Sequence, residues 1–198
     1  MSDTVLEVKN LVTTFRINKK EYPVIRDISF EIHENETLCM VGESGCGKSV
    51  TTLSVMGLLP ENGAVRSGSI KLCGEELLGM SPRQLGQVRG KKMGMIFQEP
   101  MTSLNPLLTI GYQLTEGLRQ HLGMSKAEAR ATAVSYLEKV GIANAEERMK
   151  QFPFQLSGGL RQRIMIAMMM SLQPRLLIAD EPTTALDVTI QHQILKQM

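Results

Sequence analysis

Short segments in the first half of the chain and near its end have apolar residues in the patterns of β-strands, either alternating with polar residues or continuous. Residues 5–9 and 28–32 alternate with period two, which predicts strands with one solvated face. Residues 68–72 and 92–97 predict two further strands. Residues 176–179 are apolar throughout, as is typical of a central strand in a parallel sheet. The sequence therefore predicts a sheet that is part antiparallel and part parallel.

A helical period replaces this alternation in the middle of the chain. Residues 110–121 and 126–140 have apolar positions at helical spacing. Ser125 predicts the N-cap of the second helix, with Glu128 in its first turn, and Gly141 predicts its end. We therefore expect an α/β core made of residues 1–99 and 173–198, with an inserted α-helical subdomain at 100–172.

A glycine-rich segment joins an apolar run to a helical pattern. Residues 42–49 read Gly-Glu-Ser-Gly-Cys-Gly-Lys-Ser, which is the phosphate-binding pattern GxxxxGK[ST]. Residues 37–41 before it predict a buried parallel strand, and residues 49–59 after it predict a helix. Glycines let backbone N–H groups turn toward phosphate oxygens at the helix N-terminus. In this pattern Lys48 reaches the β- and γ-phosphates, and the Ser49 hydroxyl binds Mg²⁺.

Two adjacent carboxylates follow the apolar strand at 176–179. Ligands in open α/β sheets bind at the carboxyl ends of the strands, where Asp180 and Glu181 stand. Asp180 is a candidate Mg²⁺ ligand beside Ser49, and Glu181 is a candidate base for the attacking water. Two solvated acids at a strand end are the alternative, which the phosphate loop upstream makes the weaker interpretation.

A second helix N-terminus is predicted at Ser157, followed by Gly158 and Gly159. A serine N-cap with bare first-turn N–H groups can bind an anion, or it can simply cap the helix. One nucleotide rarely needs two such termini from one subunit. We therefore expect two subunits head to tail, each offering Ser157 and its glycines to the γ-phosphate held by the other.

Composition excludes several other classes of protein. The chain has 198 residues, 42% of them hydrophobic, and a formal net charge of +2, too small to favour nucleic acid or an anionic membrane. Aromatic residues make up 4% and tryptophan is absent, which argues against base-stacking surfaces. The three cysteines lack metal-site spacing, and a reduced, cytosolic setting is the simplest interpretation.

Together these motifs resemble the nucleotide-binding subunits of ABC transporters. Residues 42–49 match Walker A, residues 176–181 match Walker B, and residues 157–159 match the LSGGQ-type signature, with Leu160 where many members have Gln. Gln98 stands at the Q-loop position. The resemblance implies the family's P-loop NTPase core with a helical subdomain, and it covers nearly the whole chain.

The resemblance also assigns roles to single residues. It implies catalytic roles for Glu181, Lys48 and Gln98, and a Mg²⁺ site of Ser49, Gln98 and Asp180. Residues 185–187 match the D-loop that touches the opposite subunit. Phe15 stands where the family stacks an aromatic ring on adenine, although it could equally be a core residue of a strand. The implied nucleotide contacts are Phe15, Gly42, Glu43, Ser44, Gly45, Cys46, Gly47, Lys48, Ser49, Val50, Ser157, Gly158 and Gly159.

A finer resemblance concerns residues 98–106 and 179–190, which are similar to the ATPases of bacterial oligopeptide and dipeptide importers. Nickel and glutathione importers share this subfamily, and the sequence does not choose the solute. The resemblance implies an ATPase, with ATP and Mg²⁺, that works at the cytoplasmic face of the inner membrane. The implied partners are a second, identical or different, ATPase subunit, the transmembrane permease subunits and, indirectly, an extracytoplasmic solute-binding protein. No nucleic-acid partner is expected.

The chain departs from the family pattern at one further position, and three other functions are alternatives. The family's switch histidine follows Walker B on a later strand, whereas His192 comes too early, so we expect a C-terminally truncated form that binds ATP better than it hydrolyses it. The first rival is an ABC-type ATPase of DNA repair or translation, which weak charge and the lack of a long insertion disfavour. The second is a GTPase or kinase, against which Asp180, Glu181 and the Ser157 motif speak. A non-catalytic regulatory module would fit only the truncated form.

Overall fold

The computed structural model describes residues 3–97, 103–182, 191–192 and 194–195. The chain forms two units, Met1–Arg89 and Gly90–Met198, and each is described by itself. The predicted division into a core of residues 1–99 and 173–198 and a helical subdomain at 100–172 stays a prediction. In the described part, no helix is both long and apolar enough to cross a membrane.

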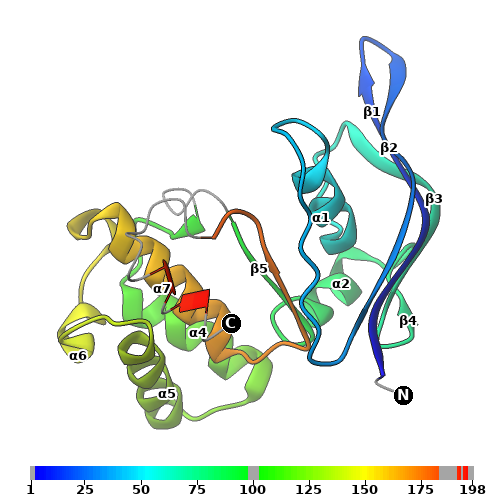
Figure 1. Cartoon of the computed structure of the whole chain (residues 1–198). Coiled ribbons are helices and arrows are strands. Elements are labelled where there is room, and N and C mark those ends of the chain that lie inside the picture. Colours follow the sequence, from blue (N-terminus) through cyan, green and yellow to red (C-terminus); the bar gives the residue numbers. More distant parts are fainter. Residues whose placement is uncertain (1–2, 98–102, 183–190, 193, 196–198) are drawn as a thin grey trace. The chain divides into compact units, whose positions relative to one another are not determined.

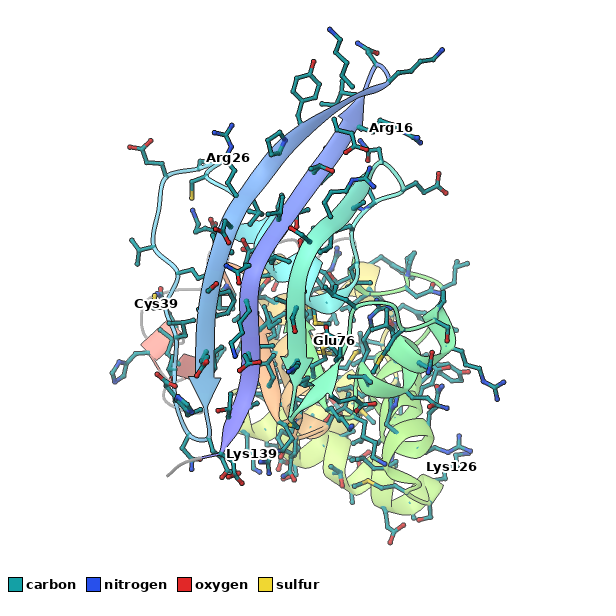
Figure 2. The ribbon with its side chains drawn as sticks, turned by 90° about the vertical axis from the view of Figure 1, so that its right-hand side faces the viewer. Arg16, Arg26, Cys39, Glu76, Lys126 and Lys139 are labelled. Carbon is teal, nitrogen blue, oxygen red and sulfur yellow. The ribbon has the colours of Figure 1, made fainter. Side chains whose placement is uncertain are left out.

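The first unit contains an antiparallel sheet in which β1 is central. The sheet has the order β2-β1-β3-β4, seen face-on in Figure 2. The apolar residues Val5, Leu6 and Val8 of β1 are buried and Lys9 is exposed, which confirms the predicted strand with one solvated face. Three of its strands are longer than their sequence patterns: β1 Thr4–Ile17, β2 Lys20–His33 and β3 Gly63–Leu72. The short β4 Glu75–Glu76 was not predicted.

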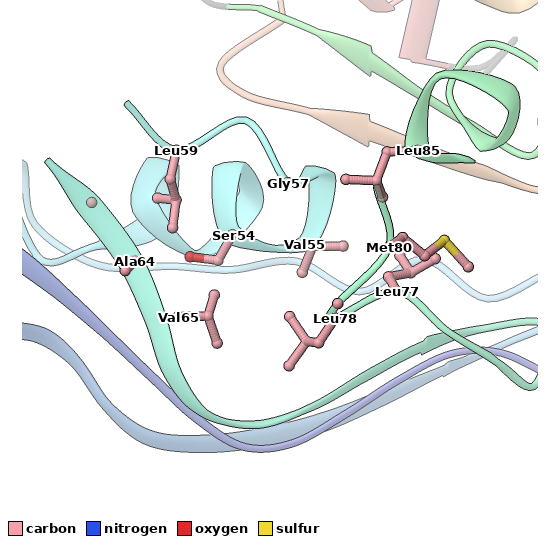
Figure 3. A pocket seen from close by; sticks show the side chains of 12 residues that line it. Ser54, Val55, Gly57, Leu59, Ala64, Val65, Leu77, Leu78, Met80 and Leu85 are labelled. Carbon is pink, nitrogen blue, oxygen red and sulfur yellow. The ribbon is translucent and has the colours of Figure 1, made fainter. Parts of the chain in front are cut away.

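Two helices accompany this sheet (Figure 1). α1 (Lys48–Met56) confirms the helix predicted after the glycine-rich segment, although it ends earlier, at Gly57. The sequence did not predict α2 (Pro82–Val88), which begins at Ser81 with a capping box to Gln84. A hollow lies between α1, β3 and the segment leading to α2, and Figure 3 shows the mostly apolar side chains that line it.

The segment before the glycine-rich loop differs from its prediction. Residues 37–41 form no strand, and their apolar side chains are exposed, with Val41 at 91%. A parallel strand exists only when neighbouring strands accept and donate its hydrogen bonds. No strand of the first unit's described sheet pairs with these residues, so their apolar composition alone does not make them a strand.

The second unit combines a parallel strand pair with a bundle of helices (Figure 1). Residues of β5 (Met93–Ile96) pair in parallel with those of β6 (Leu176–Ala179), from Met93 opposite Leu176 to Ile96 opposite Ala179. The pair confirms both predicted strands. The helices whose bounds lie within the described residues are α4 Ile110–Leu122, α5 Lys126–Lys139, α6 Ala145–Arg148, the 3-10 turn Pro153–Gln155 and α7 Gly158–Ser171.

Helix ends in the second unit follow local sequence signals. Ser125 caps α5 and exchanges hydrogen bonds with Glu128 in a capping box, as predicted. Gly141 follows with a φ of 74°, a left-handed backbone that favours glycine.

Apolar faces of α4, α5 and α7 meet in one buried core, whose fully buried members include Ile110, Leu114, Leu118, Ala133, Leu137, Ile164 and Ile166.

Candidate functional site

The backbone of residues 42–49 needs its glycines for two separate reasons. Gly45 and Gly47 have φ values of 81° and 103°, in the left-handed region. A Cβ on Gly42 would lie 2.6 Å from the Sγ atom of Cys46, and one on Gly47 would lie 2.8 Å from Cδ1 of Ile25. At Gly45 and Gly47 a side chain would strain the backbone, whereas at Gly42 it would clash with the Cys46 side chain.

Lys48 folds back onto the loop that precedes it. Its Nζ atom donates hydrogen bonds to the carbonyl oxygens of Gly42 at 2.6 Å and Glu43 at 2.9 Å. The ammonium group is thus held beside the loop backbone, where a phosphate on the loop would meet it. Glu43 and Ser44 are exposed on the same loop.

The first turn of α1 follows directly and presents polar groups. Lys48, Ser49 and Val50 are its first residues, so their backbone N–H groups have no acceptor one turn earlier in the helix. The Ser49 side chain is exposed, so its hydroxyl is open to solvent. Unpaired N–H groups, the positive helix end and a lysine together fit a nucleotide phosphate, and the exposed hydroxyl fits a Mg²⁺ ion.

The opposite end of α1 is closed by a residue that the sequence analysis did not single out. Arg89 donates through Nε to the carbonyl oxygen of Met56 at 2.9 Å and through Nη2 to that of Gly57 at 2.5 Å. Burial lowers the pKa of Arg89 below its usual value. No local sequence signal points to this contact, because Arg89 follows α2 whereas Gly57 follows α1, 32 residues away in the sequence.

Phe15 lies on β1, half-buried, opposite Tyr22 on β2 and Gly63 on β3. A Cβ on Gly63 would lie 3.2 Å from the Phe15 ring, so the ring covers the glycine. Both interpretations of Phe15, adenine stacking and strand core, remain compatible with this position.

The acidic pair directly follows β6. The Asp180 N–H donates to the carbonyl oxygen of Ile96 at 3.0 Å and so extends the parallel ladder by one residue. Asp180 is half-buried, whereas Glu181 is exposed. Glu181 has a φ of 46°, which is uncommon for a residue with a side chain. The chain thus turns sharply where the two carboxylates stand.

Ser157 caps α7 as predicted. Its Oγ atom accepts a hydrogen bond from the N–H of Leu160 at 3.4 Å. A Cβ on Gly158 would meet nothing within 4 Å, so the first turn is open on that side. Both glycines leave their N–H groups uncovered by side chains, and this helix end can accept an anion.

Gln162 connects α7 to the acidic turn and was not singled out by the sequence analysis. It is fully buried, and its Nε2 atom donates to the carbonyl oxygen of Pro182 at 2.6 Å. Gln162 stands between two arginines, and three polar residues in a row are typical of an exposed first turn. The sequence therefore gives no sign that Gln162 is buried. Within the second unit, the structure therefore brings together the α7 end and the Asp180–Glu181 turn.

Gln98 and residues 185–187 lie outside the described residues. Ser49 belongs to the first unit and Asp180 to the second, and each is placed only within its own unit. Their predicted joint Mg²⁺ site therefore stays a prediction.

Comparisons with known proteins agree on one family. The family model described as "ABC transporter" matches residues 25–184. The oligopeptide transport ATP-binding protein AppD of Bacillus subtilis is 53% identical over 98% of this chain and 60% of its own length. The dipeptide transport ATP-binding protein DppD of the same organism is 51% identical over 98% of this chain and 58% of its length. The chain thus spans about three-fifths of the length of these relatives.

Solved structures confirm the predicted fold class. The ATP-binding cassette MJ0796, in a dimeric post-hydrolysis state bound to ADP and Pi, superposes with a TM-score of 0.87 at 26% identity. The match covers 96% of this chain and 80% of that cassette. A second dimeric structure of MJ0796 superposes with a TM-score of 0.86, also at 26% identity and with the same coverage.

Proposed function

The chain belongs to the ABC transporter family, and from this premise we propose that it binds and hydrolyses ATP to power the import of peptides or a related small solute. The ammonium of Lys48, held against the loop carbonyls of Gly42 and Glu43, is the observation that carries the proposal. It supports a site for the β- and γ-phosphates. The names of AppD and DppD, oligopeptide and dipeptide transport ATP-binding proteins, support the solute class.

Nucleotide binding is proposed to rest on the first unit. Residues 42–50 surround the phosphates with backbone N–H groups, and the helix end at Lys48 adds its partial positive charge. Phe15 is proposed to stack on the adenine ring. Its half-buried ring supports this role without requiring it.

We propose that Ser49, Gln98 and Asp180 hold a Mg²⁺ ion. When bound, that ion would neutralise charge on the phosphate oxygens during transfer. The exposed Ser49 hydroxyl and the half-buried Asp180 at a strand end support this assignment. Both provide the hard oxygen ligands that Mg²⁺ prefers.

Glu181 is proposed to accept a proton from the attacking water. The water oxygen forms a bond to the γ-phosphorus, the bond from that phosphorus to the bridging oxygen of ADP breaks, and the proton passes to the Glu181 carboxylate. The exposure of the Glu181 carboxylate, just past β6, supports this role because the group can contact a water molecule. Lys48 is proposed to stabilise the charge that develops on the transferred group.

Two copies, or this chain and a related ATPase, are proposed to close head to tail around ATP. Ser157, Gly158 and Gly159 of one subunit would meet the γ-phosphate held by the other. The open first turn of α7 supports this anion contact, and the dimeric state of MJ0796 supports the pairing. ATP would then favour the closed pair, and hydrolysis would release it.

The remaining partners follow from the transport proposal. Permease subunits in the membrane would receive the movement of the helical subdomain through Gln98, and a solute-binding protein would deliver the solute to them. The proposed location is the cytoplasmic face of the membrane. The names of the relatives support these assignments.

The experiment is Glu181→Gln in the full-length protein, analysed by light scattering with saturating Mg-ATP. We expect a stable ATP-bound dimer and loss of hydrolysis, because binding is kept while water activation is lost. Glu61→Gln, at another exposed acid, is the matched control and should behave as the wild type. Only monomer at saturating ATP would count against the proposal.

A further inference from the structure

Glu181 is held in a backbone conformation that it would not adopt by itself. Its φ of 46° lies in the left-handed region, where a Cβ crowds the backbone. Pro182 makes the left-handed conformation of Glu181 still less favourable, because a residue before proline favours extended backbone. Strained backbone of this kind persists only where its surroundings fix it, and it concentrates at functional sites.

The segment before Glu181 is fixed by the strand pair. Ala179 pairs with Ile96 in the parallel ladder, and the Asp180 N–H donates to the Ile96 carbonyl oxygen at 3.0 Å. These contacts define where the chain enters the turn. A second attachment, at Pro182, holds the chain where it leaves the turn.

Gln162 provides that second attachment. Its Nε2 atom donates to the Pro182 carbonyl oxygen at 2.6 Å, and its side chain is fully buried. The Oε1 atom of the same amide has no hydrogen-bond partner within the described part of the chain. Burying an amide whose acceptor makes no hydrogen bond costs free energy. We therefore expect a glutamine at this position to have a role that offsets the cost, and its hydrogen bond to Pro182 is the contact that can provide it.

The helix that carries Gln162 is itself anchored on both sides of it. Arg161 donates through Nε to the carbonyl oxygens of Pro153 at 2.8 Å and Leu156 at 3.1 Å. Arg163 donates through Nη1 to the carbonyl oxygen of Gly141 at 2.8 Å. These bonds fix the first turns of α7, so the Gln162 amide is a rigid support for Pro182.

We propose that Gln162 is a positioning residue that keeps Glu181 in its left-handed conformation by holding the Pro182 carbonyl. This inference rests on the proposed ATPase function. It also links two proposed parts of the site: Ser157 begins the same helix, about 7.5 Å along the axis from Gln162. A γ-phosphate that binds at the N-terminus of α7 would therefore contact the same helix that positions Glu181.

The test is Gln162→Met, which keeps the side-chain length and removes the donor. We expect kcat to fall about tenfold or more, with KM and the affinity for a fluorescent ATP analogue changed less than about twofold, because the phosphate loop is untouched. Gln120→Met, at an exposed glutamine on α4, is the matched control and should leave kcat unchanged. An unchanged kcat in Gln162→Met, or KM and kcat changing together with thermal stability, would overturn the inference.

A double-mutant cycle with Glu181→Gln separates the inference from the proposed function. If Gln162 acts through Glu181, then Gln162→Met has little further effect on the residual rate of Glu181→Gln. Additive losses would contradict the inference while leaving the ATPase proposal intact. No loss of activity in Glu181→Gln would instead defeat the proposed function. Should Gln162→Met fail to fold, Gln162→Asn, which keeps an amide but shortens its reach, takes its place in the cycle with the same expected outcomes.

Discussion

The Arg89 guanidinium lies against Gly57 at the end of α1 and donates to its carbonyl oxygen at 2.5 Å. A Cβ on Gly57 would come within 3.1 Å of the Arg89 Nη2 atom, and the φ of 62° also favours glycine there. A cation near the last carbonyls of a helix complements the helix dipole. α1 therefore has its charge complement at one end in Arg89 and, in the proposed function, at the other in a phosphate.

Arg89→Ala should lower the free energy of unfolding by about 1.5–3 kcal/mol, because two charge-assisted hydrogen bonds are lost. Arg89→Lys should recover only part of this loss, since a lysine cannot donate to both carbonyl groups with fork geometry. Urea denaturation measures both. Arg83→Ala, at an exposed arginine on the preceding short helix α2, serves as the control and should change stability by less than about 0.5 kcal/mol. Equal stability of Arg89→Lys and the wild type would contradict the fork geometry.

Lys48→Ala should weaken ATP binding by about tenfold to a hundredfold or more, because a charged hydrogen-bond donor to the phosphates is removed. Titration with a fluorescent nucleotide measures the affinity. Lys19→Ala, at an exposed lysine in the turn between β1 and β2, should bind as the wild type does. Unchanged affinity in Lys48→Ala would reject the phosphate-loop assignment.

Ser157 and Ser125 provide a matched pair of N-caps within one unit. Each Oγ atom accepts a hydrogen bond from the N–H three residues later, at 3.4 Å for Ser157 and 3.3 Å for Ser125. Either serine changed to alanine should lower the free energy of unfolding by about 0.5–2 kcal/mol. Only Ser157→Ala should also weaken ATP-dependent dimerisation, which analytical ultracentrifugation measures. Equal dimerisation of the two variants would leave Ser157 as an ordinary cap.

Glu76 makes stability depend on pH. Burial acts to raise the pKa of its carboxyl, but hydrogen bonds from the Ser69 hydroxyl and from the N–H groups of Ile70 and Leu78 outweigh it, so the pKa is lowered on folding. A lowered pKa in the folded state adds stability above the unfolded pKa and loses it as the pH falls through the folded pKa. Figure 2 shows Glu76 beside the end of β3.

Glu76→Gln should therefore be less stable than the wild type at pH 7, by about 1–2 kcal/mol for the lost charged hydrogen bonds. This difference should shrink as the pH falls below the ordinary glutamate pKa of about 4.3. Urea denaturation at several pH values measures it. A difference that stays constant down to about pH 3 would rule out the carboxylate as its source.

Local sequence signals predicted the elements that depend on neighbours in the chain. Ser125 with Glu128 begins α5, Ser157 begins α7, and the apolar run of β6 has the predicted bounds. Each of these rests on a cap or a periodicity within a few residues. The α2 helix carries an equally local signal, Ser81 with Gln84, and could have been predicted from it.

Contacts between distant residues explain what the sequence could not predict. Residues 37–41 have strand composition but no strand, because pairing depends on partners elsewhere in the chain. Arg89 and Gln162 act through the carbonyl oxygens of Gly57 and Pro182, and a backbone acceptor leaves no trace in the residue type. The positive φ of Glu181 is likewise a property of its surroundings.

The two tight glycines of the phosphate loop differ in how they could be replaced over evolution. At Gly42 the obstacle to a methyl group is the Cys46 sulfur alone, since the backbone there is not left-handed. Gly42→Ala should therefore be rescued by a second change, Cys46→Gly, so that position 42 can accept alanine once position 46 is glycine. At Gly47 the φ of 103° remains even if Ile25 is trimmed, so no neighbouring substitution restores the loop. Epistasis thus frees one position of the motif and confines the other.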